Sequence, residues 1–225
     1  IRYGTYAEAD DVRSLDPDLV VIATGGFAQI PELEEGEDLV TSSWDILAGA
    51  AKPHGPVLLF DDNGGHPGMS AAEVIASSGA ELELVSPERF FAPEMGGMNH
   101  VPYMRAFQQE GVRVTINTRL VAVVRSGNQL VATLGSDYAP DYREERVVDQ
   151  VVVEHGTLPI DDLYPELKPL SRNGGAVDYD KLINGGPIFP ARSEGNFDLV
   201  RIGDAVHARN IHAAIYDGLR YAMRF

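Results

Sequence analysis

Residues 57–85 read VLLFDDNGGHPGMSAAEVIASSGAELELV. The apolar run at 57–60 is nearly continuous, which is typical of a strand buried on both faces of a parallel sheet. Apolar residues then recur at helical spacings of three and four, and Gly79 ends that pattern. The second apolar run, at 82–85, completes a β-α-β unit. This order predicts an α/β fold of the Rossmann-like kind.

Similar short apolar runs recur along the rest of the chain. The first, LVVIA, lies at 19–23, and further strands are expected at 112–116, 120–124, 130–134, 150–154 and 199–202. The stretch 158–196 is rich in Pro, Gly, Asn and Asp, so it predicts mostly loop with weak short strands, and a crossing between domains. After Asn210, one helical face carries Ile211, Ala214, Ile215, Gly218, Leu219 and Ala222, which predicts a long packed helix.

Composition narrows the possible chemistry. The 225 residues contain no cysteine, which excludes disulfides, iron–sulfur ligation and cysteine nucleophiles within them. The net charge of −16 disfavours nucleic acid and anionic membranes as partners. No apolar run is long enough to cross a bilayer, and no signal peptide is visible, so we expect a cytoplasmic location. Because the sequence begins with Ile1 in strand-like sequence, we expect a piece of a longer protein.

Two strand ends are candidates for contact with a nucleotide. Ala23, Thr24 and Gly25 follow the first strand, and their small size allows a close approach of backbone to ligand. Gly203 and Asp204 follow the last strand, where a carboxylate accepts hydrogen bonds from sugar-like hydroxyls and a helix N-terminus favours phosphate. Both motifs also have a structural interpretation. The first can be a tight strand exit, and Asp204 can be a helix-entry cap.

A third candidate is the glycine cluster Gly64, Gly65 and Gly68, which lies between strand and helix of a β-α-β unit as a pyrophosphate site does. Its spacing differs from G-x-G-x-x-G, and Asp61 and Asp62 stand where the strand leads the chain to the expected position of the phosphate. A carboxylate about 4 Å from a phosphate oxygen costs roughly 4 kcal/mol at an effective dielectric near 20. A helix dipole returns only about 0.3 to 1 kcal/mol. NAD(P)H binding is therefore doubtful here.

Other polar residues give weaker signals. Glu88 and Arg89 lie where a ribose-binding acid or a 2′-phosphate-binding arginine is found, and also where an exposed charge pair is ordinary. His66 and His155 adjoin glycines at strand ends, and either can be a ligand contact or a satisfied loop histidine. No group of side chains has metal-ligand spacing, so we expect no metal. Neither a nucleophile elbow nor a paired-carboxylate arrangement supports hydrolytic catalysis, and the catalytic residues stay unknown.

Taken in order, the motifs ATGG, DDNGGHPGMSAAE, EHGTLP and IGDAVHARNIHAAIYDG resemble the C-terminal half of the trimethylamine dehydrogenase-like flavoproteins. That group includes histamine dehydrogenase, 2,4-dienoyl-CoA reductase and N-methyl amino acid demethylases such as dimethylglycine demethylase. The likeness covers nearly the whole chain. The second and third motifs are most similar to the demethylase branch, whereas ATGG and GDA are shared with the wider glutathione-reductase-like superfamily.

The resemblance implies a partial FAD-type domain, residues 1–49 and 159–225, split by an inserted NAD-type domain, residues 50–158. It also implies an N-terminal FMN-bearing barrel with a 4Fe–4S cluster, neither of which these residues contain. Matched by motif, Ala23, Thr24, Gly25, Gly203 and Asp204 belong to the segments that meet the cofactor, and Arg209 and Ala213 to the helix start behind them. The first glycine motif of the family, which would hold the adenosine half of FAD or ADP, lies upstream of Ile1.

Three functional interpretations follow. The first is the nucleotide-binding and electron-transfer-organising region of an amine or N-methyl amino acid dehydrogenase, inactive in isolation, with FAD or ADP in a partial site. Its expected partners are its own FMN barrel and an electron-transferring flavoprotein, and a homo-oligomer fits as well. The second is an NAD(P)H-dependent reductase of the dienoyl-CoA reductase type, against which Asp61 and Asp62 argue. The third is a non-catalytic scaffold or docking domain.

Overall fold

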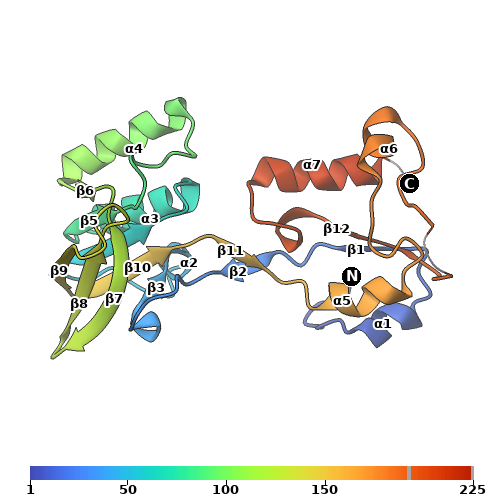
Figure 1. Cartoon of the computed structure of the whole chain (residues 1–225), viewed down its shortest axis with the longest axis horizontal. Helices are drawn as coiled ribbons and strands as arrows, with labels where there is room; N and C mark the ends of the chain where they lie inside the picture. The colour runs from blue at the N-terminus through green and yellow to red at the C-terminus, as the bar shows by residue number, and fades with distance from the viewer. Residues whose placement is uncertain (192–193, 224–225) are drawn as a thin grey trace. The chain divides into compact units, whose positions relative to one another are not determined.

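The computed structural model describes residues 1–191 and 194–223 and divides the chain into two units (Figure 1). Unit 1 is discontinuous and consists of Ile1–Phe27 and Thr157–Phe225, whereas unit 2 is Ala28–Gly156. The assignment of these units to a FAD-type and an NAD-type domain stays a prediction. The first boundary lies earlier than the predicted one after Gly49, because the segment containing Thr41–Leu47 pairs and packs with unit 2.

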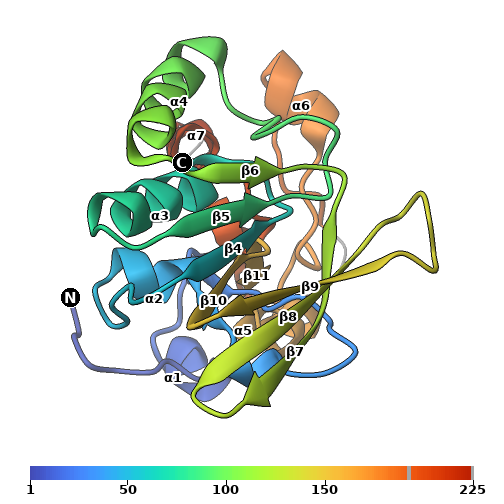
Figure 2. The same ribbon diagram turned by 90° about the vertical axis from the view of Figure 1, so that its left-hand side faces the viewer.

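Unit 2 is built on a five-stranded parallel sheet in the order β3-β10-β4-β5-β6 (Figure 2). An antiparallel meander β7-β8-β9 joins β6 to β10. The strands of the unit are β3 (Thr41–Ser42), β4 (Val57–Asp61), β5 (Leu82–Val85), β6 (Arg113–Thr115), β7 (Arg119–Ser126), β8 (Gln129–Gly135), β9 (Arg143–Val148) and β10 (Gln150–Glu154). Its helices are η1 (Glu37–Leu39), α2 (Ser43–Leu47), α3 (His66–Ser77) and α4 (Gly97–Glu110).

Helices cover one face of this sheet and the meander covers the other, as Figure 2 shows. Successive residues of a strand point to opposite faces. Accordingly Val57 and Leu59 pack among residues of α2, α3 and α4, while Leu58 and Phe60 pack among residues of the meander. All five residues of β4 are buried. The nearly continuous apolar run read from the sequence is therefore the central strand of a sheet covered on both faces.

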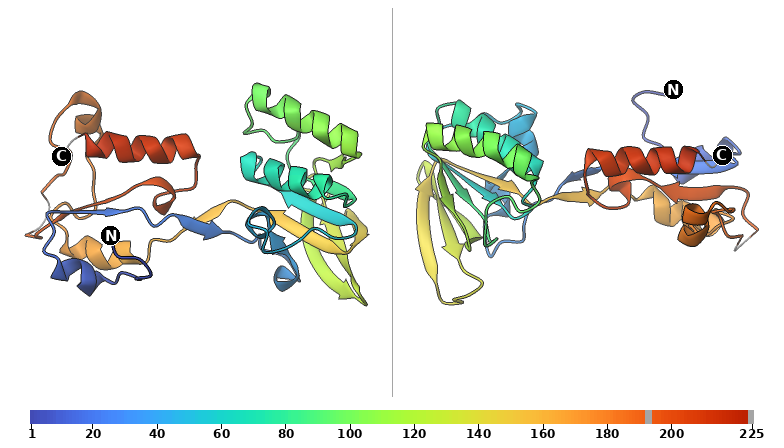
Figure 3. Two further views of the ribbon diagram at one scale, coloured as in Figure 1. Left: turned by 180° about the vertical axis from the view of Figure 1, so that it is seen from behind. Right: turned by 90° about the horizontal axis from the view of Figure 1, so that it is seen from above.

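Unit 1 has a smaller sheet, in which β1 (Leu19–Ile22) pairs in parallel with β12 (Asp198–Arg201). Helices α1 (Ala9–Ser14) and α5 (Leu163–Leu167) lie against one face, and α7 (Ile211–Ala222) lies on the other, as the left view of Figure 3 shows. The remaining elements are β2 (Gly26–Ala28), β11 (Thr157–Pro159), η2 (Lys168–Leu170), α6 (Tyr179–Asn184) and η3 (Gly203–Ala205). Strands β2 and β11 pair with each other.

The stretch 158–196 is mostly loop, as expected, but it also contains helices α5 and α6, which the sequence did not predict because each is too short to show a helical period. The helix after Asn210 is present as α7, yet it is not fully packed, since Ile211, Ile215 and Leu219 are exposed by 74%, 65% and 54%. Within the described part of the chain, no helix has the length and apolar character needed to cross a bilayer.

Candidate functional site

The predicted cofactor residues of unit 1 lie at one edge of its sheet. Strands β1 and β12 are parallel and in register, with Ile22 opposite Arg201, so the segments that follow both strands leave the sheet together. The backbone N–H of Ile202 donates to the carbonyl of Ile22 at 3.0 Å and extends the pairing. In an open parallel sheet, ligands bind outside the carboxyl ends of the strands. The structure thus brings Ala23–Gly25 and Gly203–Asp204 to that edge.

The Thr-Gly-Gly segment has a structural role of its own. The Thr24 hydroxyl donates to the carbonyl of Ile160, and the N–H of Ile160 donates to the carbonyl of Gly25 at 3.0 Å. Gly26 has no room for a side chain, because a Cβ there would lie 2.4 Å from Cγ2 of Thr157. Gly25, in contrast, faces open space on the side where a Cβ would project. Thr24 and Gly26 therefore shape the strand exit, and Gly25 leaves the backbone accessible.

Asp204 is the residue at this edge whose carboxylate is available. It lies in η3 and is half-buried, and within residues 1–191 and 194–223 its side chain has no hydrogen-bond or ion-pair partner. A carboxylate with unused lone pairs accepts hydrogen bonds from hydroxyl groups. The helix-entry cap considered from sequence is not formed, because Asn210 caps α7 by accepting from the N–H of Ala213 at 2.9 Å.

Behind Asp204, the buried carboxylate of Asp217 organises the start of α7. Asp217 is 5% exposed and accepts from the N–H of Gly203 at 3.2 Å. It forms an ion pair with Arg209 and lies 3.6 Å from a guanidinium nitrogen of Arg220. The guanidinium of Arg209 is thus paired with the carboxylate of Asp217 in the same unit. Sequence reasoning missed Asp217, although an acid on the otherwise apolar side of a helix, three residues before an arginine, is a usable signal.

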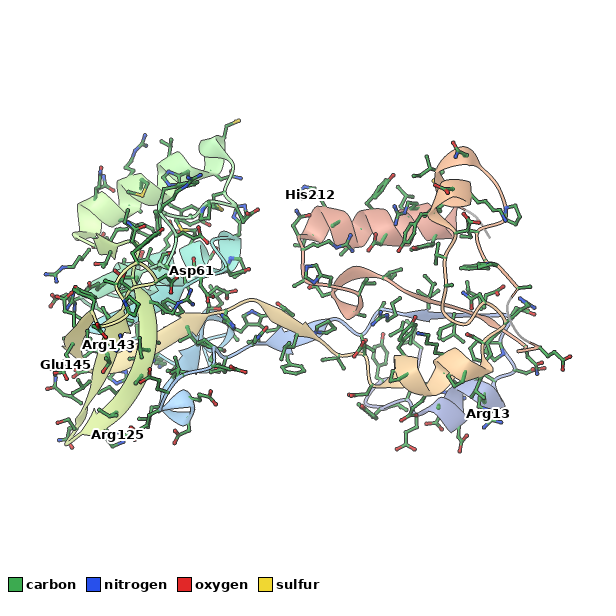
Figure 4. All side chains as sticks on the ribbon, viewed as in Figure 1. Arg13, Asp61, Arg125, Arg143, Glu145 and His212 are labelled. Carbon is green, nitrogen blue, oxygen red and sulfur yellow. The ribbon has the colours of Figure 1, made fainter. Side chains whose placement is uncertain are left out.

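In unit 2, the loop after β4 closes around one carboxylate. Asp61 is 2% exposed, and its Oδ1 accepts from the N–H of Asn63 at 3.0 Å and of Gly64 at 2.8 Å. Figure 4 labels Asp61 among the strands and helices of this unit. Backbone N–H groups of such a loop cradle pyrophosphate in a dinucleotide site. Here the N–H groups of Asn63 and Gly64 already donate to the carboxyl group of Asp61.

Burial raises the pKa of Asp61 to about 7, against the opposing effect of the two N–H donors. The nearby carboxylates of Glu154 and Asp62 push it in the same upward direction. The Asp61 side chain also fills the space beside α3, since a Cβ on Gly68 would lie 2.3 Å from Asp61 Oδ2. Gly68 is therefore required for close packing of helix against strand, and Asp61 occupies the space that this packing leaves.

A second acid, Glu154, completes the network at the same edge. It ends β10, pairs in register with Asp61 and is 2% exposed. It accepts from Ser43 Oγ, from Asn63 Nδ2 at 3.0 Å and from the N–H of Gly156 at 3.1 Å. The sequence showed Glu154 only as the last residue of a strand. Its role becomes visible once β10 and β4 are seen to be neighbours.

The remaining sequence candidates do not assemble into a site. His155 Nδ1 lies 2.7 Å from Asp62 Oδ1, so this histidine has a hydrogen-bond partner within its own loop region. That arrangement matches the structural alternative considered from the sequence. His66 is exposed and lies edge-on to the Tyr103 ring, with the ring centroids 6.5 Å apart. Glu88 and Arg89 are exposed as well. In unit 2, the carboxyl groups of Asp61, Asp62 and Glu154 lie at the carboxyl ends of the strands, and Asp61 accepts from two N–H groups of the loop.

Comparison with characterised proteins agrees with this architecture. No protein-family model matches the chain. Over 97% of its length, the chain is 52% identical to a protein of Rhizobium meliloti named "Probable N-methylproline demethylase". It is 41% identical over its whole length to an N,N-dimethylglycine/sarcosine dehydrogenase of Chromohalobacter salexigens. The chain spans only 32% and 34% of those two relatives.

Solved structures show the same fold. Histamine dehydrogenase from Rhizobium sp. 4-9 matches 98% of the chain with a TM-score of 0.72 and 22% identity, over 32% of its own length. A water-forming NADH oxidase from Lactobacillus brevis matches 92% of the chain with a TM-score of 0.60 and 17% identity, over 46% of its own length. The chain is thus an α/β region of the FAD/NAD(P)-binding flavoprotein class. Over nearly its whole length it resembles the trimethylamine dehydrogenase and dienoyl-CoA reductase-like flavoproteins, on their N-methyl amino acid demethylase side.

Proposed function

We propose that this chain is the nucleotide-binding and electron-transfer-organising region of a flavin-dependent dehydrogenase that demethylates an amine or an N-methyl amino acid. The observation that carries the proposal is the 52% identity, across nearly the whole chain, to a protein named as an N-methylproline demethylase. Oxidative chemistry on the substrate belongs to an FMN barrel, with its 4Fe–4S cluster, in the rest of the polypeptide. The 225 residues alone are then inactive.

Unit 1 holds FAD or ADP in this proposal. The support is the available Asp204 carboxylate at the shared edge of β1 and β12, with the accessible Gly25 backbone beside it. Asp204 would accept hydrogen bonds from hydroxyl groups of the bound cofactor. When bound, the nucleotide supplies binding energy and, as FAD, a redox-active ring. Asp217 supports this arrangement indirectly, because it fixes Gly203 and Arg209 at the start of α7.

Unit 2 does not deliver hydride from NAD(P)H in this proposal. Its loop N–H groups are taken by Asp61, and three acids lie at or beside the edge where pyrophosphate would bind. This geometry disfavours the reductase alternative, in which unit 2 feeds electrons to a flavin. Electrons from the substrate instead leave toward an external acceptor such as an electron-transferring flavoprotein.

Isothermal titration of the full-length protein with FAD, ADP, NADH and NADPH tests the proposal. We expect FAD or ADP to bind and the two nicotinamide nucleotides not to bind. Hydrogen bonds to a charged group contribute about 1.5 to 3 kcal/mol. Asp204→Asn should therefore weaken FAD or ADP binding by roughly 10- to 100-fold.

The matched control is Asp162→Asn, an exposed acid of the same unit, which should leave the affinity unchanged. Binding of NADH or NADPH to unit 2 would overturn the proposal in favour of the reductase. Binding of none of the four nucleotides would favour a scaffold or docking role.

A further inference from the structure

A pocket of about 500 Å³ in unit 1 is lined by residues of β12, α6 and α7. Among the described residues that line it, three are arginines, Arg201, Arg209 and Arg220, and one is an acid, Asp217. The whole chain carries a net charge of −16. The surplus of positive charge in this pocket is therefore the reverse of the overall charge, and it favours an anionic ligand.

The three arginines differ in how much hydrogen-bonding capacity they have left. Arg201 is paired with Asp161 at 2.5 Å, and Arg209 is paired with Asp217. A guanidinium nitrogen of Arg220 lies 3.6 Å from Asp217, too far for a hydrogen bond. The Nε of Arg220 is buried and has no hydrogen-bond partner within the described part of the chain. Since buried donors in proteins nearly always have an acceptor, Arg220 is the arginine whose donor is left for a ligand.

Aromatic rings hold two of these guanidinium groups in place. The guanidinium carbon of Arg220 lies 5.4 Å from the ring centroids of both Tyr216 and Tyr221. That of Arg201 lies 3.9 Å from the ring centroid of Tyr164. Such cation–π contacts restrict the side chains before any ligand arrives. The entropic cost of binding an anion is lowered as a result.

The remaining walls of the pocket are apolar and aromatic. They are formed by the side chains of Val177, Val200 and Val206 and by the rings of Tyr164, Tyr179 and Tyr221. Mostly apolar walls with a few polar groups, around a volume of about 300 to 1,000 Å³, are typical of sites for small organic molecules. An inorganic phosphate would leave these walls without contacts. A carboxylate, in turn, matches the planar guanidinium fork with two parallel hydrogen bonds.

We propose that this pocket binds an organic monocarboxylate with an aromatic body, whose carboxylate accepts from Arg220 and Arg209 and whose ring packs on the tyrosines and valines. The inference goes beyond the proposed function. Asp204 and residues 23–25, which carry the proposed nucleotide site, are not among the residues that line the pocket. The carboxylate therefore binds without displacing a nucleotide.

Isothermal titration of the full-length protein with benzoate tests the proposal. Benzamide is the neutral ligand of the same shape, and we expect it to bind at least about tenfold more weakly, since it lacks the charge-assisted hydrogen bonds. Arg220→Gln should weaken benzoate binding by at least about tenfold for the same reason. The matched control is Arg13→Gln, an exposed arginine of the same unit that does not line the pocket, and it should leave the affinity unchanged.

Arginine modification keeps the proposal testable if the Arg220→Gln variant does not fold. The parent protein is treated with phenylglyoxal, and the modified residues are located by peptide mass spectrometry. Benzoate should slow the modification of Arg220 and leave that of Arg13 unchanged. Benzamide at the same concentration should protect neither arginine.

Absence of benzoate binding would overturn the proposal, and so would equal affinities for benzoate and benzamide. Benzoate binding that is unchanged in Arg220→Gln would place the ligand elsewhere in the protein. Inorganic phosphate that binds as tightly as benzoate would show a general anion site instead of an organic one. Displacement of benzoate by FAD or ADP would make the pocket a part of the nucleotide site. If neither nucleotide binds, the proposed function fails, whereas the comparison of benzoate with benzamide stays valid.

Discussion

In unit 2 the central strand β4 has a strand on each edge and a covered surface on each face, and all five of its residues are buried. In unit 1 the strand β1 has a partner on one edge and exposes Val21 by 42%. The two sheets are built from the same kind of short apolar run. What differs is how many neighbours each strand finds within these residues. An apolar run alone therefore does not show how many neighbours its strand has.

The free energy at stake in unit 1 is large. Ile211, Ile215, Leu219 and Met223 of α7 are exposed by 74%, 65%, 54% and 73%. Fully burying a large aliphatic side chain contributes about 1.5 to 3 kcal/mol, so covering these partly exposed residues is worth about 4 to 8 kcal/mol. A whole domain is stable by only about 5 to 15 kcal/mol. The polar groups show the same contrast, because the loop of unit 2 satisfies itself with Asp61 whereas Asp204 of unit 1 has no partner within the described residues.

The largest effect is expected from the charge of Asp61. Its pKa is raised from 3.8 to about 7 by burial, so the folded state holds a proton that the unfolded state loses. The stability that depends on this proton is fully present below pH 3.8 and is lost as the pH rises to about 7. At 1.36 kcal/mol per pH unit, the loss amounts to roughly 4 kcal/mol.

Asp61→Asn should remove that pH dependence, because the amide oxygen keeps the two backbone donors satisfied without a charge. Urea unfolding of unit 2 between pH 4 and 8 measures the slope. Asp141→Asn, at an exposed acid of the same unit, should keep it. Identical slopes in the Asp61→Asn variant and the parent would mean that Asp61 is already ionised in the folded protein, and the self-satisfied loop would need another explanation.

The next effect compares two fully buried leucines. Leu59 of β4 and Leu199 of β12 are both 0% exposed. Leu59→Ala should cost about 3 kcal/mol, since the sheet and helices around it are complete and collapse little into the cavity. Leu199→Ala should cost less, because unit 1 has an open edge at which its structure can relax. Chemical unfolding of both variants in the full-length protein decides the point. Equal losses would show that unit 1 is completed as tightly as unit 2.

A smaller effect separates two glycines of unit 2. Gly68→Ala places a Cβ 2.3 Å from Asp61 Oδ2, and such overpacking costs about 1 to 3 kcal/mol. Gly97→Ala, at the first residue of α4, meets no atom within 4 Å and should stabilise the helix by about 0.5 to 1 kcal/mol. Thermal unfolding of the two variants gives opposite signs. A neutral Gly68→Ala would show that Asp61 moves aside easily.

Much of unit 2 could be predicted from sequence because its signals are local. The strands at 82–85 and 150–154 coincide with β5 and β10, and the helix before Gly79 is α3. Helix α4 gave no signal, since its Pro102 and exposed Met98 and Val101 break the amphipathic pattern. Helices of five or six residues such as α5 and α6 are too short to display a period at all.

The sites were harder to predict, because their decisive contacts join residues far apart in the chain. The sequence indicated that Asp61 and Asp62 would oppose a phosphate, and the structure adds that Asp61 takes the loop N–H groups itself. Glu154 and Asp217 escaped notice, since a buried acid is recognisable only through its donors, such as Asn63 and Arg209. Those donors come from neighbouring strands and loops, whose order the sequence does not specify.

The smallest effect is expected on the surface of the meander, where Arg119 meets Asp137 through two hydrogen bonds of 2.9 and 2.8 Å. The Arg119 guanidinium lowers the pKa of Asp137, so the pair stabilises unit 2 above the ordinary pKa and loses that effect as the pH falls. Both side chains are about half exposed, which limits the gain to about 0.2 to 1 kcal/mol. Arg119→Ala should therefore destabilise unit 2 by less than about 1 kcal/mol at pH 7.

Arg125→Ala is the matched control, because Arg125 lies on the same strand with its side chain exposed (Figure 4). Its loss should be within about 0.5 kcal/mol of zero. Urea unfolding at low and high salt sharpens the test, since screening weakens an exposed ion pair and leaves buried contacts unchanged. A loss above 2 kcal/mol for Arg119→Ala, insensitive to salt, would show that this edge of the meander is covered in the intact protein, and unit 2 would then be as incomplete as unit 1.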